Sequence, residues 1–61
     1  MNRDELIYSI KSNLEDVLED LVELHVKYGK GTTIQQTLAP EWMHQVYIMV
    51  EDSLRLIEEV Q

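Results

Sequence analysis

The sequence predicts an all-α fold: an antiparallel hairpin of two long helices at about residues 3–28 and 40–60, forming one domain over residues 1–61. The first observation is a set of apolar residues spaced alternately by three and four positions: Ile7, Ile10, Leu14, Val17, Leu21, Leu24 and Tyr28. This heptad spacing is typical of one long helix packed against other helices. The second observation is a single break at residues 29–39, and the third is a new apolar pattern with helical spacing after Pro40.

Local signals give the ends of the first helix. Asn2 is placed to cap its N-terminus, with Glu5 positioned to complete a capping box. Lys27 lies in the last turn, where a positive charge suits the helix dipole. Gly29 follows directly, and we expect it to end the helix in the left-handed conformation that glycine adopts readily.

The break at residues 29–39 is neutral and polar. Thr33 and Gln36 have the spacing of a small capping box, so one helical turn is expected there, with Ile34 and Leu38 on one face. This turn would cover the end of the hairpin. Pro40 suits the first turn of the second helix, because its fixed φ is already helical.

Both long helices have apolar arcs wider than a two-helix hairpin can bury. In the second helix the arc spans about 180° and contains Trp42, Met43, Val46, Tyr47, Met49, Val50, Leu54, Leu56, Ile57 and Val60. A chain this short buries only about 60% of its unfolded surface, and without cysteine no disulfide supports the core. We therefore expect a homodimer that forms a four-helix bundle. Its core and dimer positions would be Ile7, Ile10, Leu14, Val17, Leu21, Leu24, Val46, Val50, Leu54 and Ile57.

The chain is acidic, with twelve Asp and Glu against five Lys and Arg and a formal net charge of −7. This charge argues against direct binding to nucleic acid or to an anionic membrane, and it favours either a partner with a basic surface or simply solubility. The sequence contains no apolar run long enough for a membrane span and no apolar signal core near its start. A cytoplasmic location is the expectation.

The densest polar feature is a run of carboxylates on the side of the first helix opposite its apolar seam: Glu15, Asp16, Glu19, Asp20 and Glu23. Like charges four residues apart destabilise a helix by a few tenths of a kcal/mol per pair. The run can be a merely solvated face. The functional interpretation is a surface that binds a basic protein, and its sharper version is a DNA-mimicking inhibitor.

Glu41-Trp42-Met43-His44 has Glu-x-x-His spacing. It resembles the metal motif of ferritin-like proteins, including two-helix members that assemble across a dimer. The resemblance covers four residues and implies a metal-binding helical bundle as the alternative function. Glu41 and His44 would then be ligands, with Glu23 as the nearest carboxylate of the first helix. Both motif residues project from the polar arc, whereas such a site needs them to point inward.

The two histidines differ in their expected surroundings. His25 falls inside the apolar arc of the first helix, so we expect it to be partly shielded from solvent. A pH-sensitive or metal-binding role is the functional alternative for it. His44 lies on the polar arc of the second helix, so we expect it to be exposed.

No catalytic pattern is present: no serine is spaced informatively from a histidine, and no glycine-rich phosphate loop follows a strand. The sequence therefore favours a non-enzymatic interaction protein without cofactors. An inhibitor, an antitoxin-like neutraliser and a regulatory adaptor are the candidate roles, of the kind found among small phage or bacterial proteins. A structural subunit of a larger assembly is a third interpretation, and it would use Ile48 on the polar arc as a contact.

Overall fold

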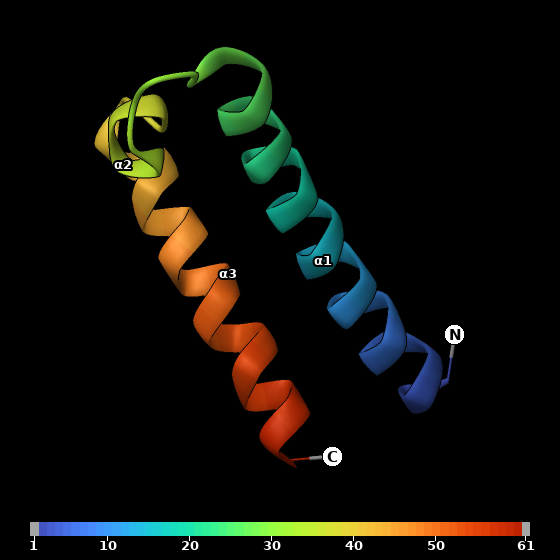
Figure 1. Ribbon diagram of the computed structural model, residues 1–61. Coiled ribbons are helices and arrows are strands. Elements are labelled where there is room, and N and C mark those ends of the chain that lie inside the picture. Colours follow the sequence, from blue (N-terminus) through green and yellow to red (C-terminus); the bar gives the residue numbers. More distant parts are fainter. Residues whose placement is uncertain (1, 61) are drawn as a thin grey trace.

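The computed structural model describes residues 2–60, with the side chain of Val60 left out. The chain folds as an antiparallel hairpin of two long helices, α1 (Arg3–Tyr28) and α3 (Glu41–Val60). A short helix, α2 (Ile34–Thr37), lies at the turn (Figure 1). The predicted all-α hairpin and the bounds of its first helix are confirmed. The second helix begins at Glu41, one residue later than expected, so Pro40 directly precedes the first turn and its carbonyl accepts from the Met43 N–H at 3.0 Å. The expected apolar position Val60 has its side chain outside the described part.

Asn2 caps the N-terminus of α1 as predicted, but the bond to the Glu5 side chain that would complete the expected capping box is not found within residues 2–60. The Asn2 side chain accepts a hydrogen bond from the backbone N–H of Glu5, with a distance of 2.8 Å. Asp4 and Glu5 then place two carboxylates in the first turn, at the positive end of the helix dipole.

The end of α1 differs from the expectation. Gly29 follows the helix with φ −105° and ψ 19°, so the predicted left-handed conformation is wrong. Glycine is needed there for space: a Cβ atom would collide with the Thr37 hydroxyl and lie 2.6 Å from His25 Nδ1. The positive φ of this turn belongs to Gly31, at 82°, where a side chain would meet open space.

The turn between the long helices is a small folded unit. Thr33 and Gln36 form the predicted capping box at the start of α2. The Thr33 hydroxyl accepts from the Gln36 N–H at 3.2 Å, and the Gln36 side chain accepts from the Thr33 N–H at 3.0 Å. Leu38 follows α2 with no exposed surface, and Ile34 is half-buried. This apolar turn covers one end of the hairpin, as expected.

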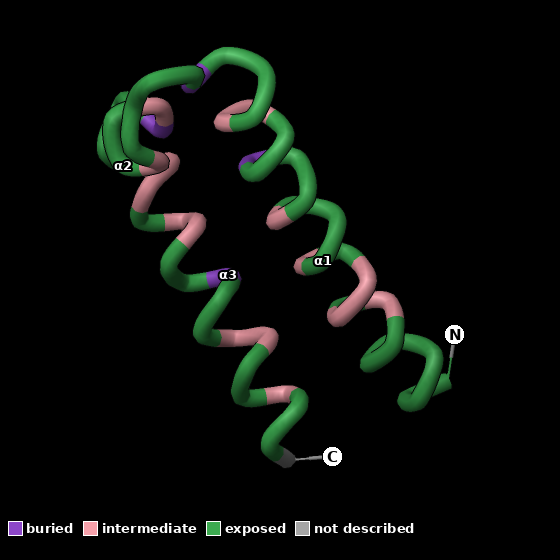
Figure 2. Tube along the Cα trace, viewed as in Figure 1, coloured by how far each residue is buried: buried purple, intermediate pink, exposed green. Residues whose placement is uncertain are grey.

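The core between α1 and α3 is thin. Leu21 on α1 and Val50 on α3 are its buried residues, at 9% and 6% exposure (Figure 2). The other expected positions form two groups. Five are half-buried: Leu14, Leu24, Val46, Leu54 and Ile57. Three on α1 are exposed within the single chain: Ile7, Ile10 and Val17.

The hairpin is an elongated rod with principal extents of 43 × 20 × 17 Å. Its radius of gyration is 13.5 Å, whereas a compact domain of this length would have ~10.5 Å. Its accessible surface is 4946 Å². A compact monomer of 7.2 kDa would expose ~4,100 Å², so the hairpin carries an excess of roughly 800 Å².

Candidate functional site

The acidic face of α1 consists of the five carboxylates that the sequence singles out, and all five are exposed: Glu15, Asp16, Glu19, Asp20 and Glu23. Glu23 pairs with Lys27 at 2.8 Å. Both partners are more than half exposed, so this pair stabilises the fold little. Among the ion pairs within residues 2–60, the other four carboxylates take no part. The acidic face therefore presents nearly its full negative charge to solvent.

An apolar ridge runs beside these carboxylates along the same helix. Leu18, Val22 and Val26 follow one another at intervals of four residues, and Val26 is 71% exposed. Together with Glu15, Glu19, Glu23 and Lys27 they line a shallow groove on α1. A partner that meets the acidic carboxylates from this side would also contact apolar surface.

A second exposed surface is apolar and involves both long helices. On α3, Trp42, Met49 and Leu56 lie seven residues apart and are 63%, 64% and 59% exposed. On α1, Ile10 and Val17 are also seven apart and are 58% and 40% exposed.

The stripes on the two helices belong to one side of the hairpin. Each residue advances the angle around the helix axis by about 100°. On this scale the stripe on each helix lies at a smaller angle than the buried residue of that helix, Leu21 or Val50. In an antiparallel pair of right-handed helices, the same sense of rotation from the shared seam leads to the same side. We call these five residues, Ile10, Val17, Trp42, Met49 and Leu56, the apolar face.

His25 belongs to a hydrogen-bonded cluster that ties the turn to α1. Its Nδ1 lies 2.8 Å from the hydroxyl of Thr37, which also lies 2.9 Å from the hydroxyl of Thr32. Thr37 donates to the Thr33 carbonyl at 3.0 Å, and Thr32 donates to the Gly29 carbonyl at 2.7 Å. A hydroxyl carries a single proton. Because the Thr37 hydroxyl donates its proton to the Thr33 carbonyl, its oxygen accepts from His25, and the imidazole donates from Nδ1. His25 is half-buried, as predicted, and its hydrogen bond to Thr37 joins α1 to the turn.

His44 is not exposed, which corrects the prediction. It is half-buried and stacks on Tyr47, with ring centroids 6.3 Å apart and an interplanar angle of 25°. The sequence places His44 on the polar arc but does not show its neighbours: Tyr47 on the same helix, and Gln35, Leu38 and Ala39 of the turn. Burial and the neighbouring Glu51 carboxylate, which also bonds the phenol, raise the pKa of Tyr47 above its ordinary value of 10.0.

The three residues of the metal alternative are not brought together in one chain. Glu41 and His44 line a small pocket beside α2 with Gln35, Leu38 and Ala39. Glu23 lines a different part of the surface and pairs with Lys27. Within residues 2–60 no group of three or more His, Cys, Asp or Glu side chains is arranged to hold a metal ion.

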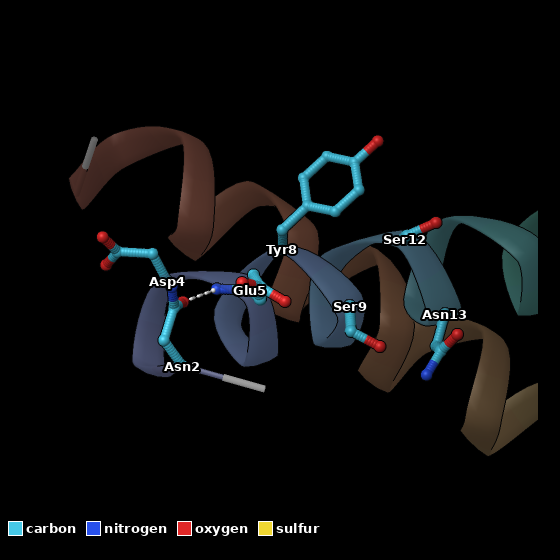
Figure 3. Close-up of a pocket in the computed structure, with 7 residues that line it drawn as sticks. All are labelled: Asn2, Asp4, Glu5, Tyr8, Ser9, Ser12 and Asn13. Carbon is cyan, nitrogen blue, oxygen red and sulfur yellow. Dashed lines mark hydrogen bonds between the residues drawn. The ribbon is translucent and has the colours of Figure 1, made fainter.

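A further pocket lies at the N-terminal end of α1 (Figure 3). Its lining comes from Asn2 and from one helix alone: Asp4, Glu5, Tyr8, Ser9, Ser12 and Asn13. Figure 3 shows these side chains projecting from the helix, and Tyr8 is 73% exposed. The two carboxylates oppose an anionic ligand at this helix end. The lining contains two carboxylates and a phenol but no histidine, lysine or arginine.

No model of a known protein family, no curated protein and no solved structure matches the chain. None of the three described helices combines the length and the apolar character that crossing a membrane requires.

Proposed function

We propose that this chain is a non-enzymatic interaction protein that acts as a homodimer and binds another protein through the acidic face of α1. The observation that carries the proposal is the exposure of two chemically different surfaces on one small hairpin. The apolar face is suited to self-association, and the acidic face is suited to a partner with a basic surface. The two surfaces occupy different sides of α1: the carboxylates centre on the side opposite the seam, with Asp16 and Asp20 at the edge nearest the apolar face.

The size of the exposed surface supports the homodimer. The excess of roughly 800 Å² over a compact monomer is similar to the ~800 Å² that each partner buries in a standard protein interface. The residues of the apolar face carry no charge, so two acidic chains can associate without burying a carboxylate. Pairing two hairpins would also thicken the thin core to that of a four-helix bundle.

The charge distribution supports the chemistry of the partner. Four unpaired carboxylates on one helix face steer a basic surface toward α1 and favour it over acidic competitors. An inhibitor, an antitoxin-like neutraliser or a regulatory adaptor would each use such a surface. In the DNA-mimicking version, the carboxylates contact the groups of a nucleic-acid-binding protein that otherwise bind the phosphates of the nucleic acid.

Charge reversal with a matched control tests the proposal. Glu19→Lys with Asp20→Lys changes the acidic face, whereas Glu58→Lys with Glu59→Lys makes the same change in net charge on exposed positions of α3. Each variant and the wild type are used to capture proteins from extracts of the source cells at several salt concentrations. We expect the control pair to retain the partner that the wild type captures and the acidic-face pair to lose it. Equal capture by both double variants would show that the carboxylates are only solvated.

A further inference from the structure

The spacing of the apolar face fits a second copy of the same chain. Ile10 and Val17 on α1 are seven positions apart. On α3, Met49 is seven positions from Trp42 and seven from Leu56. Equal heptad spacing on both helices allows the side chains of one helix to pack between those of another. A two-fold axis would then make each of these contacts twice. A partner of different sequence would need a matching pattern of its own.

We propose that a second copy covers the apolar face so that α1 of each chain lies over α3 of the other. This arrangement rests on the homodimer proposed above and specifies its interface. Val17 of one chain would lie near Met49 of the other, because both residues lie near the middle of their helices. All neighbouring helices of the resulting bundle would be antiparallel.

The acidic face decides between the two symmetric arrangements. If α1 lay over α1 instead, the two acidic faces would lie on one side of the bundle, with helix axes about 8–10 Å apart. That spacing is within about one Debye length at physiological salt, so the repulsion would be poorly screened. Asp16 and Asp20 would be the closest carboxylates, because they lie on the edge of α1 nearest the apolar face. Packing α1 over α3 separates the two acidic faces.

The arrangement has a consequence for partner binding. The two acidic faces would lie on opposite sides of the bundle, so the homodimer would present two separate docking surfaces. A partner could bind each one without contacting the other. The dimer would therefore bind two basic partners at once. Alternatively, it would bind a single partner whose two basic sites are far enough apart to contact both sides of the bundle.

Cysteine cross-linking tests the arrangement cleanly, because the natural chain has no cysteine. Val17→Cys and Met49→Cys are made in separate chains, which are mixed, allowed to exchange subunits and treated with a short bismaleimide. We expect a cross-linked pair in the mixture and little in either variant alone. The two Met49 positions would lie on diagonal helices, roughly 13 Å apart given the usual spacing. Ile48→Cys, on the polar arc of α3, is the matched control and should not react with Val17→Cys.

The outcomes separate this inference from the proposed function. Efficient cross-linking of Met49→Cys with itself would overturn the arrangement, since it places α3 over α3. Cross-linking through Ile48→Cys would overturn the choice of face. Both results would leave the homodimer intact. A monomer in sedimentation of the wild-type chain would overturn the homodimer together with this inference, whereas the charge-reversal test of the acidic face would stand.

Discussion

The imidazole of His25 and the hydroxyl of Thr37 are joined by a hydrogen bond of 2.8 Å between α1 and α2. The two residues are twelve positions apart, and the bond closes the turn at the end of the hairpin. Because Thr37 also donates to the Thr33 carbonyl at 3.0 Å, its hydroxyl connects the short helix to the long one. Gly29 lies beside this bond and leaves the space that it occupies.

Removing the Thr37 hydroxyl should loosen this turn. Thr37→Val keeps the shape of the side chain and loses its hydrogen bonds, so we expect the free energy of unfolding to fall by about 1 kcal/mol. Thr37→Ser retains the hydroxyl and should remain close to the wild type. Urea unfolding followed by circular dichroism measures both. If the valine variant is as stable as the wild type, the bond to His25 does not hold the turn.

Replacing the two glycines should have different effects. Gly29→Ala would press a methyl group against Thr37 and His25, and overpacking of this kind typically destabilises by about 1–3 kcal/mol. The alanine of Gly31→Ala would meet no neighbour, but it would adopt a φ of 82°. This left-handed conformation should lower the free energy of unfolding by about 1–2 kcal/mol. Adding Thr37→Ala should relieve part of the first effect and none of the second, as measured in a double-mutant cycle. Strict additivity for both glycines would contradict the crowded geometry at Gly29.

The sequence predicts the long elements and their ends because those depend on local patterns. Heptad spacing identifies α1, and the spacing of Thr33 and Gln36 identifies the small capping box before α2. It does not show which of two nearby glycines takes the positive φ, since that depends on how the turn packs against His25. It also does not show how far α1 is rotated about its own axis. That rotation leaves Ile10 exposed in the single chain.

The shielding of His44 could not be predicted for a similar reason, because it depends on contacts that arc positions do not describe. Arc positions show the direction of a side chain relative to the seam, and they place His44 on the polar side. They do not include contacts between neighbours on one helix face, such as the stacking of His44 on Tyr47. The sequence does contain a local signal for this contact, because His44 and Tyr47 both carry rings and lie three positions apart on one helix.

Tyr47 makes the hairpin sensitive to alkaline pH. Its pKa is raised by burial and by Glu51, so the folded state holds the phenolic proton more tightly than the unfolded chain does. This contribution is fully present below pH 10 and is lost as the pH rises through the raised value. We expect Tyr47→Phe to show a smaller loss of stability between pH 9 and about pH 11 than the wild type.

Glu51→Gln isolates the part of this effect that comes from the carboxylate. The variant removes the charge beside the phenol and leaves its burial unchanged, so the pKa of Tyr47 should fall toward its ordinary value. Absorbance titration of tyrosinate in a Tyr8→Phe, Tyr28→Phe background measures it, because those two phenols are 73% and 79% exposed. An unchanged titration midpoint would leave burial as the sole cause.

Two adjacent residues of α3 separate folding from dimer formation. Val50 is 6% exposed and Met49 is 64% exposed. Val50→Asp would bury an uncompensated charge, so it should unfold the chain at every protein concentration. Met49→Glu places its charge on the apolar face instead, where it opposes only the approach of a second copy.

The concentration dependence of thermal unfolding distinguishes these two effects. If dimer formation stabilises the fold, the melting temperature of the wild type should rise with protein concentration. Met49→Glu should lose much of this rise, so its melting temperature should fall furthest below that of the wild type at high concentration, where the wild type is dimeric. Ile48→Glu adds the same charge one position earlier, on the polar arc, and should keep the wild-type dependence. A wild-type melting temperature independent of concentration would mean that the single hairpin is stable alone. Loss of the dependence in Ile48→Glu but not in Met49→Glu would place the dimer contact on the polar side of α3.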